Sequence, residues 1–202
     1  MAVKDHSLDD KIIGAARAEF LEHGFQKASL HKIADRAGIT TGALYTRYKN
    51  KDALFCSLVE TFLSQMRPTD ETMRQSYLDV QFSGSAEELL AVLRREEQVY
   101  LDLMFEHYEE CVLFFCRSDG SSIQKMLDGM MQNKAAQTIA YLKRIARRDY
   151  DFDGLELILC EQFRYYRLVL EKGDDKQRAL ACMKTVEDFL EAGWKALFER
   201  IL

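Results

Sequence analysis

Proline, paired cysteines and long apolar runs are scarce in this chain of 202 residues. There is one proline, Pro68, and the five cysteines form no C-x-x-C pair, which argues against a disulfide framework and a zinc ribbon. The longest apolar runs, 111–116 and 155–160, are too short to cross a bilayer, and the first residues lack the apolar segment of a signal peptide. We therefore expect a soluble, cytoplasmic protein with reduced cysteines and with no metal, cofactor or membrane partner.

Alternation of apolar and polar residues is also missing over any stretch long enough to predict a sheet. The dense Leu, Glu, Lys, Arg, Ala and Met content favours helices, so the expected fold class is all-α. Four short helices are predicted at the start of the chain. Their boundaries are the capping residues Ser7, Ser29, Thr40 and Asn50 and the helix-ending glycines Gly24 and Gly38.

Longer helices are predicted in the rest of the chain. Their expected ranges are 86–108, 109–117, 122–148, 155–172 and 176–201. The polar stretch 69–85 follows Pro68 and is predicted mainly as a loop.

Positive charge is concentrated in one segment of an acidic chain. The net charge is −5, yet residues 26–51 contain six Lys or Arg and a single Asp, a local charge of +5 that leaves −10 for the remainder. Such a distribution suits a protein that touches a polyanion with one end only, although a solvated run of charges is the alternative.

The second and third helices, joined by a short turn at Gly38, have the dimensions of a helix-turn-helix motif. Leu44 must face inward, which leaves Gly42 and Tyr45 on the outer side of the third helix. Glycine there costs about 1 kcal/mol of helix propensity, a cost that makes sense if a DNA base edge comes close. The alternative is that Gly42 and Tyr45 pack against another part of the same protein.

Residues 29–54 closely resemble the DNA-binding domain of TetR-family transcriptional regulators. The matching elements are I-A, A-G, G-x-L-Y, an aromatic residue three positions later, and the K-D-A-L start of the fourth helix. The resemblance implies a three-helix DNA-binding domain over 1–62, with the fourth helix as connector, and a helical effector and dimerisation domain over 63–202. It also implies a homodimer, usually a repressor, that binds a palindromic operator and is released by a small molecule.

The resemblance further implies which residues meet DNA. The third helix would lie against base edges or the sugar-phosphate backbone, and Lys51 would meet a phosphate. Arg47 stands where the family often has His, and either adds a phosphate contact or is solvated. The full predicted DNA-binding set is His31, Lys32, Thr40, Thr41, Gly42, Ala43, Tyr45, Arg47, Tyr48 and Lys51.

Two polar residues point toward the apolar face of the helix predicted over 86–108. Glu96 and His107 must be paired with another helix or lie in a cavity that receives a polar ligand. An acidic Glu96 favours a cationic or hydrogen-bond-donating ligand, unless an arginine such as Arg164 reverses the local charge. The predicted ligand pocket consists of Glu96, Tyr100, Met104, His107, Cys111, Met126, Met130, Phe163 and Tyr166.

The last helix has a packing seam with apolar residues at alternating steps of three and four. Two long terminal helices with more apolar surface than one domain needs indicate self-association, and the alternative is that they only close the core of a single chain. The predicted dimer interface consists of Arg167, Met183, Val186, Leu190, Trp194 and Leu197.

Motifs of the common enzyme classes are absent, so we expect no enzymatic activity. Three alternatives remain open at this point. The chain could be a helical-bundle enzyme that uses Glu96 and His107 as an acid-base pair, a regulator that senses redox state through Cys111 and Cys116, or a purely structural interaction protein.

Overall fold

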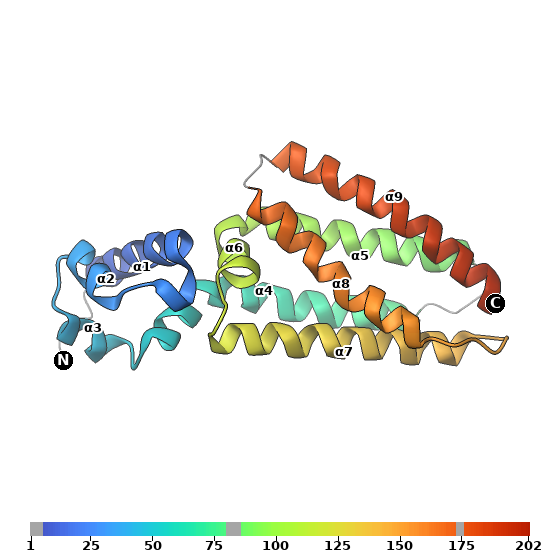
Figure 1. The fold of residues 1–202 in the computed structure, drawn as a ribbon, viewed down its shortest axis with the longest axis horizontal. Coiled ribbons are helices and arrows are strands. Elements are labelled where there is room, and N and C mark those ends of the chain that lie inside the picture. Colours follow the sequence, from blue (N-terminus) through green and yellow to red (C-terminus); the bar gives the residue numbers. More distant parts are fainter. Residues whose placement is uncertain (1–5, 80–85, 173–175) are drawn as a thin grey trace. The chain divides into compact units, whose positions relative to one another are not determined.

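The computed structural model describes residues 6–79, 86–172 and 176–202, and helix is the only regular secondary structure among them. The helices are α1 (His6–Lys27), α2 (Leu30–Ala37), α3 (Thr41–Arg47), α4 (Lys51–Asp79), α5 (Ala86–Glu106), α6 (Tyr108–Cys116), α7 (Ser122–Ile145), α8 (Asp153–Glu171) and α9 (Lys176–Ile201), as Figure 1 shows. The all-α prediction is therefore confirmed. Among the described helices we find none with both the length and the hydropathy of a membrane span.

The described chain divides into two compact units. The first contains the residues up to Leu63 together with Glu109–Leu127, and the second contains the described parts of Ser64–Tyr108 and Asp128–Leu202. Nearly all of α6 therefore belongs with α1–α3, although it follows α5 in the chain. Both α4 and α7 contribute residues to each unit.

Phenylalanine rings form the centre of the first unit. Phe20 of α1 and Phe55 of α4 meet edge to face with centroids 4.9 Å apart, and Phe62 of α4 meets Phe114 of α6 at 5.5 Å. All four rings are fully buried. Because such aromatic pairs contribute about 0.5–1.5 kcal/mol each beyond their burial, they hold α1, α4 and α6 together.

Gly24 breaks the regular geometry of α1. Its φ of 70° lies in the left-handed region that glycine tolerates best. The helix was expected to end there, but after the break the chain continues in α1 as far as Lys27. The N–H of Phe25 donates to the carbonyl of Arg117 at 2.8 Å, so the break is also where α1 meets the segment after α6.

The loop predicted over 69–85 is wrong for residues 69–79, because α4 continues through Pro68 to Asp79. Proline in a helix interior costs about 3 kcal/mol. The buried Met66 and Met73 lie seven residues apart on one side of α4, and their burial favours an unbroken helix. The hydroxyl of Thr69 adds a hydrogen bond to the carbonyl of Gln65 at 2.9 Å. The rest of that prediction, residues 80–85, lies outside the described residues.

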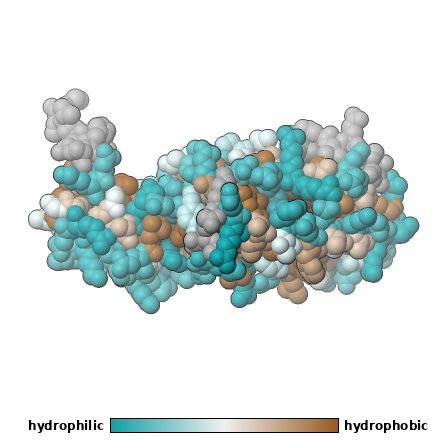
Figure 2. All heavy atoms as spheres, turned by 90° about the horizontal axis from the view of Figure 1, so that it is seen from above, coloured by the Kyte–Doolittle hydropathy of each residue, from teal (hydrophilic) through white to brown (hydrophobic). Residues whose placement is uncertain are grey.

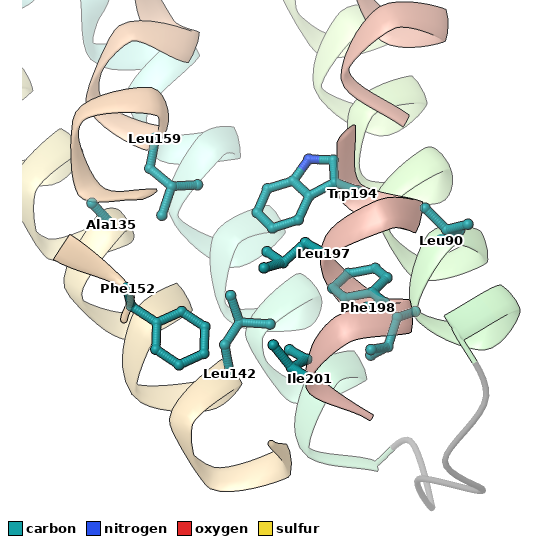
Figure 3. Close-up of a cluster of buried hydrophobic side chains, with 10 residues drawn as sticks. Leu90, Ala135, Leu142, Phe152, Leu159, Trp194, Leu197, Phe198 and Ile201 are labelled. Atoms are coloured by element: carbon teal, nitrogen blue, oxygen red, sulfur yellow. The ribbon is translucent and has the colours of Figure 1, made fainter. Parts of the chain in front are cut away.

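An apolar cluster of the second unit lies among α5, α7, α8 and α9 (Figure 3). Trp194 and Phe198 of α9 stack with centroids 5.7 Å apart, and they pack with side chains from the other three helices. The buried members are Leu89, Leu90, Ala135, Leu142, Phe152, Leu159, Trp194, Leu197, Phe198 and Ile201. A second cluster joins α5, α8 and α9 through Leu101, Val169, Ala179 and Met183.

Candidate functional sites

Helices α2 and α3 form the predicted helix-turn-helix motif, and each expected cap is present. The Ser29 hydroxyl accepts a hydrogen bond from the N–H of Lys32, and the Thr40 hydroxyl accepts one from Ala43. Between the helices, Gly38 has a φ of 72°, and its N–H donates to carbonyls at the end of α2. The capped ends and the left-handed glycine fix the angle at which α3 follows α2.

The outer face of α3 is exposed. Leu44 is buried beneath the helix, whereas Gly42 and Thr46 are exposed and Tyr45 is 52 % exposed. A Cβ atom added to Gly42 would meet only the hydroxyl of Thr40, at 3.8 Å, so the packing of this chain does not require glycine there. The alternative in which Gly42 and Tyr45 pack against the same protein is therefore wrong.

The polar residues around α3 have different surroundings. Lys32 is exposed, and the exposed His31 places its Nδ1 2.8 Å from the carboxylate of Asp35, one turn along α2. Thr41, Ala43 and Tyr48 are half-buried. The Nε of Arg47 donates to the Asp9 carboxylate of α1 at 2.8 Å. The ammonium of Lys51 donates to the carbonyls of Gln26, in α1, and Ala28, just after it, both at 3.1 Å.

Glu96 of α5 is buried, as predicted, and forms an ion pair with Lys134 of α7. The ammonium of Lys134 also lies 5.6 Å from the ring centroid of Tyr100, whose hydroxyl donates to the carboxylate of Asp70. Burial, and then the Asp70 carboxylate, raise the pKa of Tyr100 far above its ordinary value, so the phenol keeps its proton. Burial also raises the pKa of Asp70.

Two further carboxyl groups lie near this ion pair. Glu97 of α5 and Glu187 of α9 are hydrogen-bonded to each other. Burial and the neighbouring Glu187 raise the pKa of Glu97 to about 8. Burial raises the pKa of Tyr166 as well, and the charges of Glu97, Glu96 and Glu187 add to the effect. We refer to Asp70, Glu96, Glu97, Tyr100, Lys134, Tyr166 and Glu187 as the polar cluster.

Four members of the polar cluster were missed from the sequence: Asp70, Glu97, Lys134 and Glu187. Asp70 was missed because its segment was expected to be a loop. The other three were missed because, in the sequence, a charged residue on a helix looks the same whether it is buried or solvated.

The other residues predicted for the ligand pocket lie in different parts of the fold. Met104 is buried, and His107 and Met130 are half-buried, in the second unit. Cys111 and Met126 belong to the first unit. The side chain of Phe163 lies outside the described residues.

The two cysteines of the redox alternative lie on α6 and are buried. Burial raises the pKa of the Cys111 thiol far above its ordinary value. Because the thiolate is the reactive form, this environment disfavours redox sensing through Cys111 and Cys116.

Comparison with known proteins relates part of the chain to one family. Residues 12–58 match the family model described as bacterial regulatory proteins, tetR family. The probable acrEF/envCD operon repressor of Escherichia coli K12 is 44 % identical over 45 residues, which cover 22 % of this chain and 20 % of that protein. The HTH-type transcriptional repressor Rv1474c of Mycobacterium tuberculosis is 32 % identical over 56 residues, covering 28 % and 30 %. Residues 12–58 therefore match the tetR family, in the segment that holds the helix-turn-helix motif.

The two sequence matches span less than a third of the length of either relative. The match to the family model falls in the part of the chain that holds the helix-turn-helix motif. The fold similarity extends further. A TetR-like transcriptional regulator from Rhodococcus sp. RHA1 aligns over 97 % of this chain and 98 % of its own, with a TM-score of 0.60 and 18 % identity. The helical fold beyond the helix-turn-helix motif is therefore shared with this TetR-like protein.

The residues predicted for the dimer interface differ in their surroundings within the single chain. Met183, Trp194 and Leu197 are buried in the apolar clusters of the chain itself, because the seam of α9 packs on α5 and α8. Val186 and Leu190 are half-buried. The guanidinium of Arg167 pairs with Glu171 on the same helix at 3.1 Å.

Other apolar side chains of α8 and α9 are exposed. Phe189 is 79 % exposed and Leu157 72 %, and about half of Ile158 and Leu168 is exposed too. The residues Ala192, Gly193 and Ala196, near Phe189 on α9, are small and exposed. Figure 2 shows hydrophobic residues at the surface among the hydrophilic ones. The sequence could have revealed these residues only as the apolar positions that do not fit the buried stripe of each helix.

Proposed function

We propose that this protein is a ligand-responsive transcriptional regulator that represses its target genes by binding operator DNA in the cytoplasm, and that it is not an enzyme. The observation that carries the proposal is the outer face of α3, where Tyr45 is 52 % exposed and where the exposed Gly42 is not required by the packing of the chain. A helix that keeps an exposed glycine despite its cost in helix propensity suits close approach to a base edge in the major groove.

The DNA-binding surface combines this face with the basic segment 26–51. Tyr45 supplies a ring for contact with sugar or a thymine methyl group and a hydroxyl for a phosphate. Thr41, Ala43 and Thr46 border it on α3, and Lys32 and His31 extend it along α2. The net charge of +5 in this segment supports attraction to phosphate, in a chain whose remainder carries −10.

The proposed regulator is a homodimer that presents two copies of α3 to a palindromic operator, about 34–36 Å apart. The exposed apolar side chains of α8 and α9 support this assembly, because Leu157 and Phe189 bury little surface within the chain. The small residues near Phe189 suit close contact between helices.

The effector is proposed to bind in the second unit at the polar cluster. Its four carboxyl groups outnumber the cations near them, Lys134 and Lys184, which favours a cationic or hydrogen-bond-donating ligand. The exposed Arg164 pairs with Glu161 at 3.4 Å, so it does not offset this negative charge. Cationic amphiphiles should raise the melting temperature of the wild type and act more weakly on Glu96→Gln. Equal shifts in both proteins would place the effector elsewhere.

The connection between the units gives a route by which the effector could act on DNA. The chain passes between them after Leu63, after Tyr108 and after Leu127. In the first unit, Arg17 of α1 pairs with Glu109 and Glu110 of α6 at 3.1 and 3.0 Å. Any shift of α6 that follows effector binding would therefore be passed to α1, and with it to the helix-turn-helix motif.

The test is Gly42→Ala, with Gly14→Ala as a matched control in α1. Neither added methyl group meets a close neighbour within the chain, and both replace an exposed helical glycine. We expect both variants to be more stable than the wild type, by about 0.5–1 kcal/mol. Only Gly42→Ala should bind DNA less tightly, when affinity for a duplex selected by the wild type is measured by fluorescence anisotropy. Equal DNA affinity of Gly42→Ala and Gly14→Ala would contradict the proposed groove contact.

A further inference from the structure

Helix α3 has few side chains of the kinds that form strong hydrogen bonds with base edges. Such contacts are made by Arg or Lys with guanine, by Asn or Gln with adenine, and by Glu or Asp with cytosine. Residues 41–47 contain one residue of these kinds, Arg47, at the end of the helix. Its Nε donates to Asp9, and its remaining donors suit a DNA phosphate. The rest of α3 must therefore recognise bases by another kind of contact.

The exposed Thr46 offers chiefly a methyl group to a partner. Its hydroxyl donates to the carbonyl of Ala43, three residues earlier in the same helix, at 2.6 Å. A bond of this kind fixes the χ1 angle of threonine, and the methyl group on the same Cβ atom then points in another direction. The hydroxyl of Thr40 is occupied as well, since it accepts a hydrogen bond from the N–H of Ala43 at 3.1 Å. Both hydroxyl groups thus serve the helix itself.

Gly42 leaves a notch in the outer face of α3. Tyr45 and Thr46 follow it by three and four residues, so their side chains are its neighbours on the same face of the helix. The nearest atom of the chain to a Cβ placed on Gly42 is the Thr40 hydroxyl, at 3.8 Å, so the space above the glycine is open to a partner. An aromatic ring and a methyl group border this space. The apolar group that a base presents in the major groove is the C5-methyl of thymine.

We propose that the notch formed by Gly42, Tyr45 and Thr46 receives the C5-methyl group of a thymine, so that α3 selects an A·T pair by apolar contact. This inference rests on the proposed DNA-binding function and specifies which base its recognition helix reads. Arg47 and Lys51 keep their predicted place at the sugar-phosphate backbone. The half-site of the operator should therefore contain a thymine whose methyl group is needed for tight binding.

The first experiment removes the methyl group from the DNA. The wild type selects a duplex from a random library, and each thymine of one half-site is then replaced in turn by deoxyuridine, which lacks the C5-methyl and keeps the base pair. We expect affinity, measured by fluorescence anisotropy, to fall about fourfold at the thymine that enters the notch, the factor for one buried methyl-sized group. Thymines that face away from α3 should tolerate the replacement.

The second experiment fills the notch from the side of the protein. Gly42→Ala places a methyl group in the space that the thymine methyl would occupy. At the sensitive position, deoxyuridine should therefore leave the affinity of Gly42→Ala unchanged or raise it, because the two methyl groups compete for one site. Gly14→Ala, the matched control in α1, should keep the fourfold loss of the wild type.

Substitutions of Thr46 separate its methyl group from its hydroxyl. Thr46→Val keeps the methyl group and should retain both the affinity of the wild type and its sensitivity to deoxyuridine. Thr46→Ser keeps the hydroxyl, and we expect weaker binding to the thymine duplex and a smaller effect of deoxyuridine. Thr72→Ser is the matched control, because Thr72 is an exposed residue of α4 whose hydroxyl also donates to a carbonyl of its own helix, that of Pro68 at 2.9 Å. It should bind DNA as the wild type does.

The outcomes distinguish this inference from the proposed function. A wild-type protein that selects no duplex contradicts the proposed function itself. A selected half-site without thymine, or one that tolerates deoxyuridine at every position, overturns the notch. Independent losses from Gly42→Ala and from deoxyuridine overturn it too, since they show that the two methyl groups do not meet. Weaker binding by Thr46→Val than by Thr46→Ser shows that the hydroxyl is read, and it overturns the role of the Thr46 methyl group.

Discussion

At the scale of single residues, Glu97 and Glu187 form a hydrogen bond between two carboxyl groups, so one of them must hold a proton. The charge of Glu96, on α5, acts on Glu97, and Lys184 and Asp188 lie near Glu187 on α9. The phenol of Tyr166, on α8, also lies near both carboxyl groups. Burial, with the help of Glu187, raises the pKa of Glu97 to about 8 in the folded chain. The native state then binds more protons than the unfolded chain. This stabilisation is complete below the ordinary carboxyl pKa and is lost as the pH rises through about 8.

The melting temperature of the wild type should therefore fall as the pH rises from about 5 to about 9. In Glu97→Gln the amide can donate to Glu187 at every pH, so we expect the fall to shrink by about 2–4 °C, measured by circular dichroism. Glu156→Gln replaces an exposed carboxylate of α8 and should keep the wild-type pH dependence. A Glu97→Gln profile parallel to that of the wild type would show that the pair does not share a proton.

At the scale of helices, periodicity and capping chemistry predicted most elements, because apolar spacing, caps and glycines act locally. The caps Ser29 and Thr40 and the turn at Gly38 were all found where their sequence context placed them. The prediction of a loop after Pro68 failed because the helix there depends on contacts that are not local. The preference of proline is local, whereas the burial of Met66 and Met73 depends on the rest of the fold and outweighs it.

Which partner a side chain meets could not be predicted from the same patterns. The sequence marked Lys51 and Arg47 as cations of a DNA-binding segment, but their bonds to α1 depend on how the helices cross. Glu96 was predicted to point inward, whereas its partner Lys134 lies 38 positions away on α7. A pattern of charges thus predicts that a segment carries a charged surface. Only the packing of the helices shows which of those charged side chains are already bonded within the chain.

At the scale of the whole molecule, the apolar pattern of α9 alone could not show which of its faces is exposed and available for assembly. The apolar seam with Trp194 and Leu197 packs into a core cluster of the single chain, whereas the exposed Phe189 belongs to another face of α9. Helices α8 and α9 contact each other, so Leu157 and Phe189 are on neighbouring elements that can form one self-complementary surface. A two-fold dimer would bury this surface against its own copy.

We expect the wild type to sediment as a dimer in reducing buffer at micromolar concentration, and Phe189→Glu to sediment as a monomer. Because Phe189 is 79 % exposed in the single chain, this change removes little packing within the chain and should preserve the helical content. Tyr45→Ala, which removes an exposed aromatic ring from the first unit, is the matched control and should remain a dimer. The affinity of Phe189→Glu for a palindromic duplex should also fall, since two unlinked copies of α3 must then bind independently. A wild type that sediments as a monomer, or a dimeric Phe189→Glu, would exclude this face of α8 and α9 as the interface.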